Sequence, residues 1–528
     1  MKQSNYDYYS VPKINNLHEL VQQRKDSPRT AFMWRENGEI QRRSFQDVYQ
    51  DVTRLSGLFY EKYRGVNIAV IGENSYAWII YSLAIVLSGN VCVAIDKDGD
   101  LKTIKKQLKQ CDIKALCYSD TYNPEAQSLT KNNYSFSNLK SNIRQGAKLK
   151  NQYRVDENKP AMIFFTSGTT GYSKAVVLSE RNIATDIYGA ASIFKPSGGV
   201  SSFLPYHHAF GYVTSALKPY YYGVLTFISS SFKHLTDDFQ TSHPNTIFAV
   251  PMVVETFYKQ IWREARRSKT DKKLQRGLKI SNMLLKVGID QRYNFFKDIH
   301  RQFGGKLRYI ICGGAPLDPS YVKWFRQIGI EVLNGYGITE CSPVVAVNRN
   351  QYHQDGSVGQ ICRDVDVRII DGEIAVGGDI VMLGYYKDKR ATEAVLRNNY
   401  YFTGDLGYID ANGFLYVTGR KKNLIILSNG ENVSPEEIEK ELAKNPAISE
   451  VAVYEYQNRI IASIYPAEGY LGDQEFYDDI IYEYNQTKAK NRQIAMVHLR
   501  SKPFPRNNNG KVVRDKLIEE DNHERKNH

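Results

Sequence analysis

Cysteine is scarce in this chain, and its spacing excludes the usual cysteine-based sites. There is no C-x-x-C pair and no matching His-x-x-x-His among the six cysteines: Cys92, Cys111, Cys117, Cys312, Cys341 and Cys362. Zinc sites need closely spaced ligands, and disulfide frameworks belong to small secreted domains. We therefore expect buried structural thiols in place of a zinc site or a disulfide framework.

Long apolar runs are also missing. The longest, residues 78–87, is roughly half of the about 20 residues that a transmembrane helix needs. Residues 1–15 carry charged, amide and tyrosine side chains where a secretion signal would have a short apolar core. We expect a cytoplasmic protein without a transmembrane helix, and peripheral contact with the inner face of a membrane remains open.

The length and composition are those of a folded protein with more than one domain. The chain has 528 residues, of which 42% are hydrophobic and 24% charged. A single core stops growing beyond about 250–300 residues, so the chain should divide into domains or fused subdomains. The net charge of +13 indicates polyanionic partners. Nucleotides, coenzyme A, an acidic carrier protein, an anionic membrane or nucleic acid would all fit.

One segment concentrates the positive charge. Only Glu264 and Asp271 oppose its basic residues, which are Lys259, Arg263, Arg266, Arg267, Lys269, Lys272, Lys273, Arg276 and Lys279. A solvated helical face is the simpler interpretation of such a run. Contact with an anionic membrane or with a carrier protein is the alternative, and the sequence leaves both open.

Apolar strands alternate with helices in the N-terminal part. An apolar strand over 68–71 is followed by a polar cap ending at Ser75, an apolar helix to Leu87, and Gly89 before another strand. Similar strands recur at 161–165, at 174–178 before a helix starting from Ser179, at 246–250 and at 307–312. This repetition predicts α/β layers with largely parallel sheets.

The pattern changes past Gly407 to short strands and turns. Residues 410–413 are typical of a hairpin turn, and the polar run 420–423 between apolar strands places a boundary near Arg420. Beyond it we expect a helix capped by Ser434 and strands over 450–454 and 460–465. These elements predict a small α+β domain at the C-terminal end.

The strongest chemical signal is the loop at residues 166–174, with the sequence TSGTTGYSK. Glycine and small hydroxyl residues let backbone N–H groups close on phosphate oxygens, and Lys174 adds a positive charge. The loop differs from the P-loop of the NTPases, in which lysine directly follows the second glycine. Here Tyr172 and Ser173 intervene.

This loop resembles the nucleotide-binding signature of the adenylate-forming superfamily, which includes acyl-CoA synthetases, adenylation domains of peptide synthetases and beetle luciferases. Further matches follow in the family's order: 204–211 (LPYHHAFG), 313–317 (GGAPL), 334–340 (NGYGITE), 372–374 (GEI), 401–405 (YFTGD), 419–422 (GRKK) and 505–511 (PRNNNGK). Their joint order makes coincidence negligible. Ser173, Ala175 and the asparagines at 507–509 depart from the usual pattern and leave the subfamily open.

The resemblance implies catalytic roles for four residues. Glu340 and Thr166 would hold Mg²⁺, and Lys511 would bridge the substrate carboxylate and the α-phosphate of ATP. His208 would lie beside the substrate carboxylate, although a packed core histidine is an alternative. These roles suit the chemistry, because a carboxylate is already ionised at neutral pH and needs charge neutralisation and alignment rather than a general base.

The resemblance also implies a nucleotide site. Residues 314–316 would form one wall of the adenine pocket, the ring of Tyr336 would stack on the base, and Asp405 and Arg420 would contact the ribose. The full implied set is Ser167, Gly168, Thr169, Thr170, Gly171, Lys174, Gly314, Ala315, Pro316, Asn334, Gly335, Tyr336, Gly337, Thr339, Asp405 and Arg420.

Two domains and a hinge follow from the same resemblance. A large N-terminal domain of layered α/β subdomains (1–419) would bind nucleotide and acyl substrate, and a small mobile α+β domain (425–528) would rotate about a hinge (420–424) at Lys422. One orientation would place Lys511 for adenylation. The other would place residues 428–432, with Gly430, along a channel for the incoming thiol. A plain surface turn is the alternative at 428–432.

The substrate is the least specified part of this prediction. Amino-acid-activating members carry a Phe-Asp-x-Ser motif near 207–212, and it is missing here. Residues 335–348 and the basic insert before 303–307 resemble bacterial long-chain fatty-acid CoA ligases and acyl-carrier-protein ligases. We expect ATP, Mg²⁺, coenzyme A and a medium- or long-chain fatty acid, with no nucleic acid. An acyl-carrier-protein ligase, a luciferase-like oxygenase and a non-catalytic nucleotide-sensing or scaffold protein are the alternatives.

Overall fold

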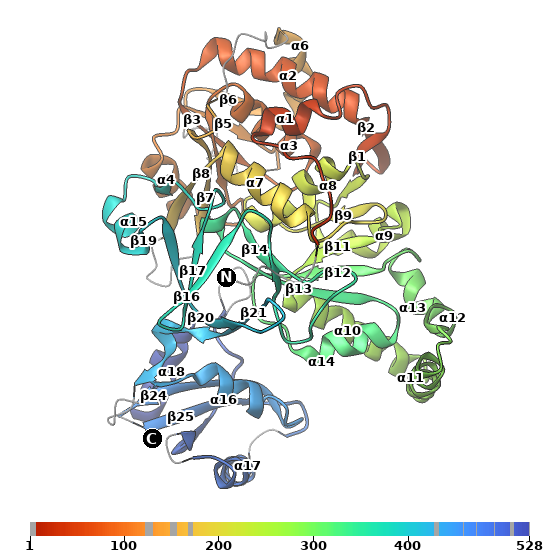
Figure 1. Cartoon of the computed structure of the whole chain (residues 1–528), viewed down its shortest axis with the longest axis vertical. Coiled ribbons are helices and arrows are strands. Elements are labelled where there is room, and N and C mark those ends of the chain that lie inside the picture. The colour runs from red at the N-terminus through yellow and green to blue at the C-terminus, as the bar shows by residue number, and fades with distance from the viewer. Residues whose placement is uncertain are drawn as a thin grey trace.

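A computed structural model describes residues 7–121, 130–147, 156–166, 173–426, 432–457, 459–470, 473–489, 492–506 and 512–526. These residues form a seven-stranded and a fourteen-stranded sheet, a two-stranded ladder and a three-stranded C-terminal sheet. Helices cover the two large sheets, and the C-terminal sheet lies in a smaller lobe beneath strands β20 and β21 (Figure 1). The predicted combination of a large α/β part and a small α+β part is confirmed.

The seven-stranded sheet contains the first predicted β-α-β unit. Strand β3 (Asn67–Ile71) pairs in parallel with β4 (Val91–Ile95), and helix α3 (Tyr76–Leu87) connects them. The Ser75 hydroxyl caps α3 by accepting a hydrogen bond from the Trp78 N–H at 3.2 Å. Because α3 is apolar on nearly every side, it is buried within the core, as its sequence predicts.

The strands of this sheet run in the order β18-β8-β7-β4-β3-β5-β6. The remaining members are β5 (Ala115–Tyr118), β6 (Asn133–Ser135), β7 (Pro160–Thr166), β8 (Lys174–Ser179) and β18 (Gly384–Tyr385). The helices of this region are α1 (Leu17–Gln22), α2 (Phe45–Lys62), α4 (Leu101–Gln110), α6 (Leu139–Gln145) and α7 (Glu180–Ala191).

Strands β7 and β8 correct one part of the sequence interpretation. They pair in antiparallel fashion with Thr166 opposite Lys174, whereas the repeated alternation predicted parallel strands there. Parallel neighbours need a crossover of about a dozen residues or more, and residues 167–173 are too few for one. The antiparallel pairing brings the two ends of the predicted phosphate loop side by side.

The fourteen-stranded sheet is parallel in one half and antiparallel in the other. Strands β10, β9, β11, β12 and β13 pair in parallel, and pairing becomes antiparallel from β13 onward through β14, β15, β21, β20, β17 and β16. The prediction of largely parallel sheets is therefore wrong for this second half. Short apolar runs specify a strand but carry no information on its direction.

The strands of this sheet are β1 (Thr30–Glu36), β2 (Glu39–Ser44), β9 (Val200–Ser202), β10 (Thr226–Ile228), β11 (Thr246–Ala249), β12 (Tyr309–Cys312), β13 (Glu331–Gly337), β14 (Val344–Val347), β15 (Gly359–Ile361), β16 (Asp366–Ile370), β17 (Glu373–Gly377), β19 (Leu396–Arg397), β20 (Tyr400–Ile409) and β21 (Phe414–Arg420). Its helices are α8 (Lys218–Tyr222), α9 (Leu235–Ser242), α10 (Pro251–Arg267), α11 (Asp271–Lys286), α12 (Arg292–Phe295), α13 (Lys297–Gln302), α14 (Pro319–Gln327) and α15 (Lys389–Val395).

The predicted hairpin turn at 410–413 joins β20 to β21. One carboxylate oxygen of Asp410 accepts hydrogen bonds from the N–H groups of Asn412 and Phe414, both at 2.9 Å, and Gly413 has φ +82°. A left-handed residue of this kind favours glycine. The turn sets the register in which Asp405 faces Arg420.

The C-terminal lobe has an apolar core of its own. Its elements are β22 (Ile425–Ile426), β23 (Asn432–Val433), α16 (Pro435–Leu442), β24 (Ile448–Tyr456), β25 (Arg459–Pro466), α17 (Gln474–Gln486), β26 (Met496–Leu499) and α18 (Arg514–Lys526). Ser434 precedes α16, but the predicted cap is not formed. Its hydroxyl contacts the Thr418 carbonyl oxygen at 3.3 Å and a Glu436 carboxylate oxygen at 3.0 Å instead.

The six cysteines are all buried and free of disulfide bonds, as predicted. Over the described ranges, no helix combines the length and the apolar character needed to cross a membrane.

Candidate active site

The predicted adenine-site residues lie at the carboxyl ends of two neighbouring parallel strands. Strand β12 leads into residues 314–316, which are exposed, and β13 ends with residues 334–337. Gly314 has φ +88°, and a Cβ at Gly337 would lie 1.7 Å from the Pro343 carbonyl oxygen, so both positions require glycine. Ligands of open α/β sheets bind at such strand ends.

The three side chains predicted to contact adenosine meet directly. The Tyr336 hydroxyl donates to one Asp405 carboxylate oxygen at 2.6 Å, and the Arg420 Nε lies 2.7 Å from the other. Asp405 is only 4% exposed, so these contacts offset the cost of burying its charge. Burial, followed by the nearby charge of Asp405, raises the pKa of Tyr336, which therefore remains a hydrogen-bond donor.

Glu340, the predicted metal ligand, lies in the short 3₁₀ segment η4 (Thr339–Cys341) and is 8% exposed. The Tyr385 hydroxyl donates to Glu340 Oε1 at 2.9 Å. The Lys174 Nζ lies 4.5 Å from the centroid of the same tyrosine ring. Tyr385 therefore joins the end of the predicted phosphate loop to the predicted metal ligand.

Tyr401 extends this network. Its hydroxyl is hydrogen-bonded to Tyr385, and burial is the largest cause that raises the pKa of both tyrosines, with the negative charge of Glu340 next. The sequence analysis assigned no role to Tyr385 or Tyr401. Tyr401 stands in a matched motif, which was a signal, whereas Tyr385 stands in a two-residue strand whose pairing the sequence does not reveal.

The two histidines of the 204–211 motif occupy different environments. The His207 ring is 9% exposed, and its Nε2 lies 3.4 Å from Asp96 Oδ1. Burial is the main cause that lowers the pKa of His207 well below its usual value, and the charges of His208 and Lys97 act in the same direction. His208, the predicted substrate neighbour, is half-buried, with its ring centroid 4.2 Å from that of His207.

Glu373 of the matched 372–374 motif supports the Asp405–Arg420 pair through its two chain neighbours. One of its carboxylate oxygens accepts a hydrogen bond from the Gly404 N–H at 2.9 Å, and the other lies 2.8 Å from the Lys421 Nζ. Gly404 directly precedes Asp405, and Lys421 directly follows Arg420. Glu373 thus holds both sides of the Asp405–Arg420 pair, a role that the motif alone did not reveal.

The family follows from comparison with known proteins. Residues 20–386 match the family model described as AMP-binding enzyme, and residues 422–524 match that of the AMP-binding enzyme C-terminal domain. The chain belongs to the AMP-binding enzyme family. It is 30% identical over 313 residues to the long-chain-fatty-acid–CoA ligase FadD15 of Mycobacterium bovis. That match covers 56% of this chain and 52% of the relative, so the chain spans about half the length of this relative.

Two other similarities extend over most of the chain. The 2-succinylbenzoate–CoA ligase of Listeria monocytogenes is 25% identical over 490 residues, covering 90% of this chain and 94% of the relative. A solved structure of the o-succinylbenzoate coenzyme A synthetase of Bacillus subtilis, in complex with ATP and magnesium ion, has a TM-score of 0.74 at 22% identity. It covers 95% of this chain and 99% of that chain, which supports the same overall fold.

Several predicted residues of this AMP-binding enzyme cannot be placed. Outside the described residues lie Lys511, Gly430, Ser167, Gly168, Thr169, Thr170 and Gly171. Their flanks are described. Thr166 and Lys174 face each other across β7 and β8, and an isolated bridge between Arg506 and Val512 flanks the segment with Lys511.

The Arg506–Val512 bridge lies near the large N-terminal part. Burial raises the pKa of Glu255 on α10, and the positive charges of Lys259 and Arg506 oppose this rise. Arg506 is itself paired with Glu450 of β24 at 2.7 Å. The strand β11 that leads into α10 is the parallel neighbour of β12, which carries the predicted adenine wall. The positive charge of Arg506 therefore acts on α10, the helix that follows β11.

The donor set around Glu340 fits a magnesium ion that is shared with phosphates. The described parts of the chain contain no group of three His, Cys, Asp or Glu residues able to hold a metal ion by themselves. Mg²⁺ bound to nucleotides typically takes one or two protein carboxylates together with phosphate oxygens and water. One buried carboxylate, at Glu340, matches that pattern, and Thr166, the second predicted ligand, stands at the end of β7 opposite Lys174.

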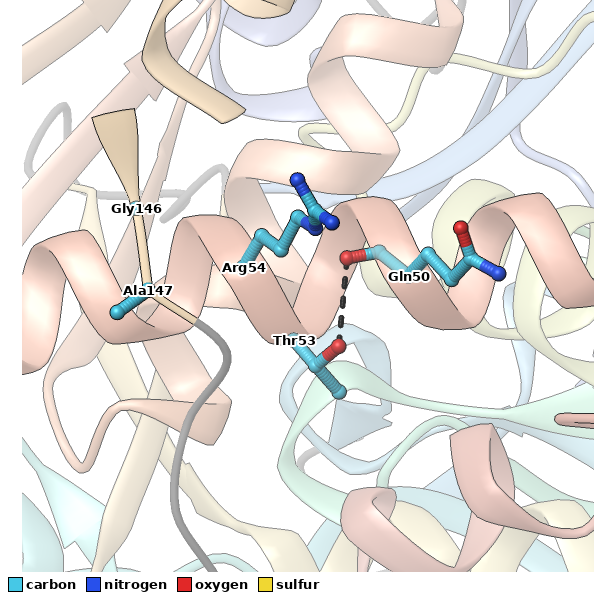
Figure 2. Close-up of a pocket in the computed structure, with 5 residues that line it drawn as sticks. All are labelled: Gln50, Thr53, Arg54, Gly146 and Ala147. Atoms are coloured by element: carbon cyan, nitrogen blue, oxygen red, sulfur yellow. Dashed lines mark hydrogen bonds between the residues drawn. The ribbon is translucent and has the colours of Figure 1, made fainter. Parts of the chain in front are cut away.

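A surface pocket of about 500 Å³ lies away from these residues. Figure 2 shows its lining on helix α2 and after α6, namely Gln50, Thr53, Arg54, Gly146 and Ala147. The Thr53 hydroxyl donates to the Gln50 carbonyl oxygen at 3.3 Å, which leaves it engaged within the helix. None of the predicted site residues lines this pocket.

Proposed function

We propose that this enzyme uses ATP to convert a carboxylic acid to its acyl-adenylate and then transfers the acyl group to the thiol of coenzyme A. The observation that carries the proposal is the meeting of Tyr336, Asp405 and Arg420 at the carboxyl ends of β12 and β13. Asp405 supplies acceptors for ribose hydroxyls, and the exposed residues 314–316 leave a face for the base. The AMP-binding family supports the same nucleotide.

The charged side chains match what adenylation requires. Lys174 lies at the end of the phosphate loop and carries the positive charge needed beside phosphate oxygens. Glu340 and Thr166 would hold Mg²⁺, which when bound neutralises phosphate charge. Tyr385 keeps the Glu340 carboxylate oriented through its 2.9 Å hydrogen bond. We assign Lys511 to the developing charge between the substrate carboxylate and the α-phosphate, and His208 to the acyl-substrate side.

We further propose a hinge at Lys422 between an N-terminal domain (1–419) and a C-terminal domain (425–528). Lys422 is exposed in the 3₁₀ segment η5 (Lys421–Asn423). On one side of it the Lys421 Nζ contacts Glu373 of the large part, and on the other the Asn423 Nδ2 contacts Glu436 of α16 at 2.7 Å. Lys422 therefore lies between anchors to two different bodies, which suits rotation that exchanges Lys511 for Gly430.

The acid that we propose is a medium- or long-chain fatty acid. The long-chain ligase among the relatives and the similarity of residues 335–348 to fatty-acid ligases support this choice. The succinylbenzoate ligase favours an aromatic acid as the competitor. Coenzyme A is the proposed acceptor, with acyl carrier protein as the alternative because a basic surface also suits an acidic protein.

ATP–pyrophosphate exchange across a panel of fatty and aromatic acids tests this function. We expect exchange that depends on Mg²⁺ and is fastest with a fatty acid. When coenzyme A is added, acyl-CoA should form, and mass spectrometry identifies this product. Fastest exchange with an aromatic acid would replace the substrate. Acyl transfer to carrier protein alone would replace the acceptor, and no exchange with any acid would contradict the proposed reaction.

A further inference from the structure

We infer that helix α11 and the turn after it form a surface that binds anionic lipid bilayers. Helix α11 (Asp271–Lys286) lies at the outer edge of the molecule, away from the C-terminal lobe (Figure 1). Its inner face packs through Leu278 and Ser281, which are 9% and 0% exposed. The side chains of the opposite face are exposed. We call it the α11 surface, and it consists of Lys272, Arg276, Lys279, Ile280, Met283, Val287 and Ile289.

Aliphatic side chains project from the C-terminal half of this surface. Met283 and Val287 are 68% and 71% exposed, and Ile280 and Ile289 are 48% and 47% exposed. The spacing 276, 280, 283 and 287 places these positions on one stripe of the helix. Single exposed aliphatic residues are ordinary on protein surfaces, but neighbouring ones mark a site of interaction. The sequence analysis found the charges of this segment and missed its apolar part.

Positive charge borders the aliphatic residues. Lys272, Arg276 and Lys279 precede them on the same stripe and are exposed. Asp290, the nearest acidic residue in the following turn, is paired with Arg292 at 2.8 Å, so its charge is balanced locally. A helix with cations beside exposed aliphatic side chains matches the boundary between anionic headgroups and acyl chains.

Charge complementarity and shape together favour a bilayer over a carrier protein. An acidic protein surface would account for the cations, but it would also need an apolar groove to bury four projecting aliphatic side chains. A bilayer accounts for both, because the aliphatic residues enter the acyl boundary while the cations remain among phosphates. This inference goes beyond the proposed reaction. Binding to vesicles is measured without ATP or acid, so either proposal can fail while the other holds.

Co-sedimentation of the full chain with vesicles tests this surface. Phosphatidylcholine vesicles with phosphatidylglycerol should bind the protein. Pure phosphatidylcholine vesicles should bind it at least tenfold more weakly, because each of the three cations near an anionic surface raises affinity roughly fivefold. Raising salt from about 0.1 M to about 1 M shortens the Debye length from about 10 Å to about 3 Å and should release the protein from the anionic vesicles.

Two variants separate charge from insertion. Combined Lys272→Glu, Arg276→Glu and Lys279→Glu should abolish binding to anionic vesicles. The matched control reverses the same number of exposed lysines on α4, through Lys102→Glu, Lys105→Glu and Lys109→Glu, and should retain binding. Met283→Gln with Val287→Gln should weaken binding without changing net charge. Since all these side chains are exposed, thermal unfolding should match that of the parent.

The readout of insertion is a Met283→Trp variant, whose emission should shift to the blue when anionic vesicles are added. The inference is overturned if the parent fails to bind anionic vesicles, if the α4 control loses as much binding as the α11 variant, or if Met283→Trp emission is unchanged. It is equally overturned if the α11 variant loses binding to acyl carrier protein while binding to vesicles stays unchanged.

Discussion

Asp405 and Lys422 lie seventeen positions apart in the chain by their numbering, yet the structure fixes them in opposite ways. Asp405 lies in a paired strand, and two side chains contact its carboxylate at 2.6 and 2.7 Å. Lys422 lies in a three-residue 3₁₀ segment, exposed, between contacts that lead to Glu373 on one side and to Glu436 on the other.

This difference indicates how one site can serve the two proposed steps, adenylation and acyl transfer. Nucleotide binding gains from side chains whose geometry is set before the ligand arrives. Exchange of one functional loop for another needs a short segment whose backbone angles can change without breaking a core. The chain provides the first on β20 and β21 and the second immediately after β21 ends. The predictions below separate the two parts.

Lys511→Ala should have the largest effect, because the proposed role of this lysine is confined to charge that develops during adenylation. Pyrophosphate exchange should fall by roughly a hundredfold or more, as for other losses of such electrostatic contacts. ATP binding should change little, since Asp405, Tyr336 and Lys174 remain. Single-turnover formation of acyl-adenylate and nucleotide titration measure the two effects, and near-normal exchange would remove Lys511 from the site.

Lys422→Pro should affect only the second step. Proline fixes φ near −65° and removes a backbone donor, which in a helix costs about 3 kcal/mol. If the same free energy is added to the barrier between the two orientations of the C-terminal domain, thioester formation should slow by up to roughly a hundredfold, at about 1.4 kcal/mol per tenfold. Acyl-adenylate should still form.

Its matched control is Lys422→Ala, which removes the side chain and keeps backbone freedom. Gly430→Leu should give the same split by filling the proposed thiol channel. A single-turnover assay that scores acyl-adenylate and thioester separately decides the outcome. Equal losses in both steps would place the hinge elsewhere, and undiminished thioester formation in both variants would remove the rotation.

The sequence predicted local elements well and long-range pairing poorly. Helix α3 and the β20–β21 turn carry their own signals, namely the Ser75 cap and the 410–413 turn residues. The direction of β8 relative to β7 depends on how short the connection is, and the antiparallel half of the large sheet depends on partners distant in the chain. Apolar strand patterns contain neither kind of information.

The site shows the same division. Motif resemblance brought out Tyr336, Asp405 and Arg420, which the structure joins in one hydrogen-bonded group. It missed Tyr385 because the two contacts of that residue are distant in the chain. Tyr385 follows Glu340 by 45 positions and Lys174 by more than 200. Contacts of this kind arise from packing of β18 against β8, which no local pattern encodes.

Tyr385→Phe should have an intermediate effect, which acts on the proposed metal ligand Glu340. The ring that faces Lys174 remains, but Glu340 loses its donor, and a hydrogen bond to a charged group contributes about 1.5–3 kcal/mol. Apparent affinity for Mg²⁺ in pyrophosphate exchange should weaken by roughly tenfold or more. Tyr386→Phe, which removes a hydroxyl bonded to Asn67, is the matched control. An unchanged Mg²⁺ dependence would show that Tyr385 does not position Glu340.

The smallest effect should come from His207, a buried residue of the N-terminal part whose pKa is lower in the folded protein than in the unfolded chain. Burial, with the charges of His208 and Lys97, keeps the pKa of His207 well below its usual value, despite Asp96 at 3.4 Å. In the unfolded chain the pKa returns to about 6.5. Between these two values the unfolded state binds more protons, so the free energy of unfolding should rise with pH through this window by at most about 1.4 kcal/mol per pH unit and level off above about 6.5.

Urea unfolding of His207→Gln across pH 5 to 8 should show a shallower slope of unfolding free energy against pH than the parent below about pH 6.5. The exposed His234→Gln variant should retain the parental slope. If both variants keep it, the pKa of His207 is the same in the folded and the unfolded chain, and its part of the site is more open to water than its burial indicates.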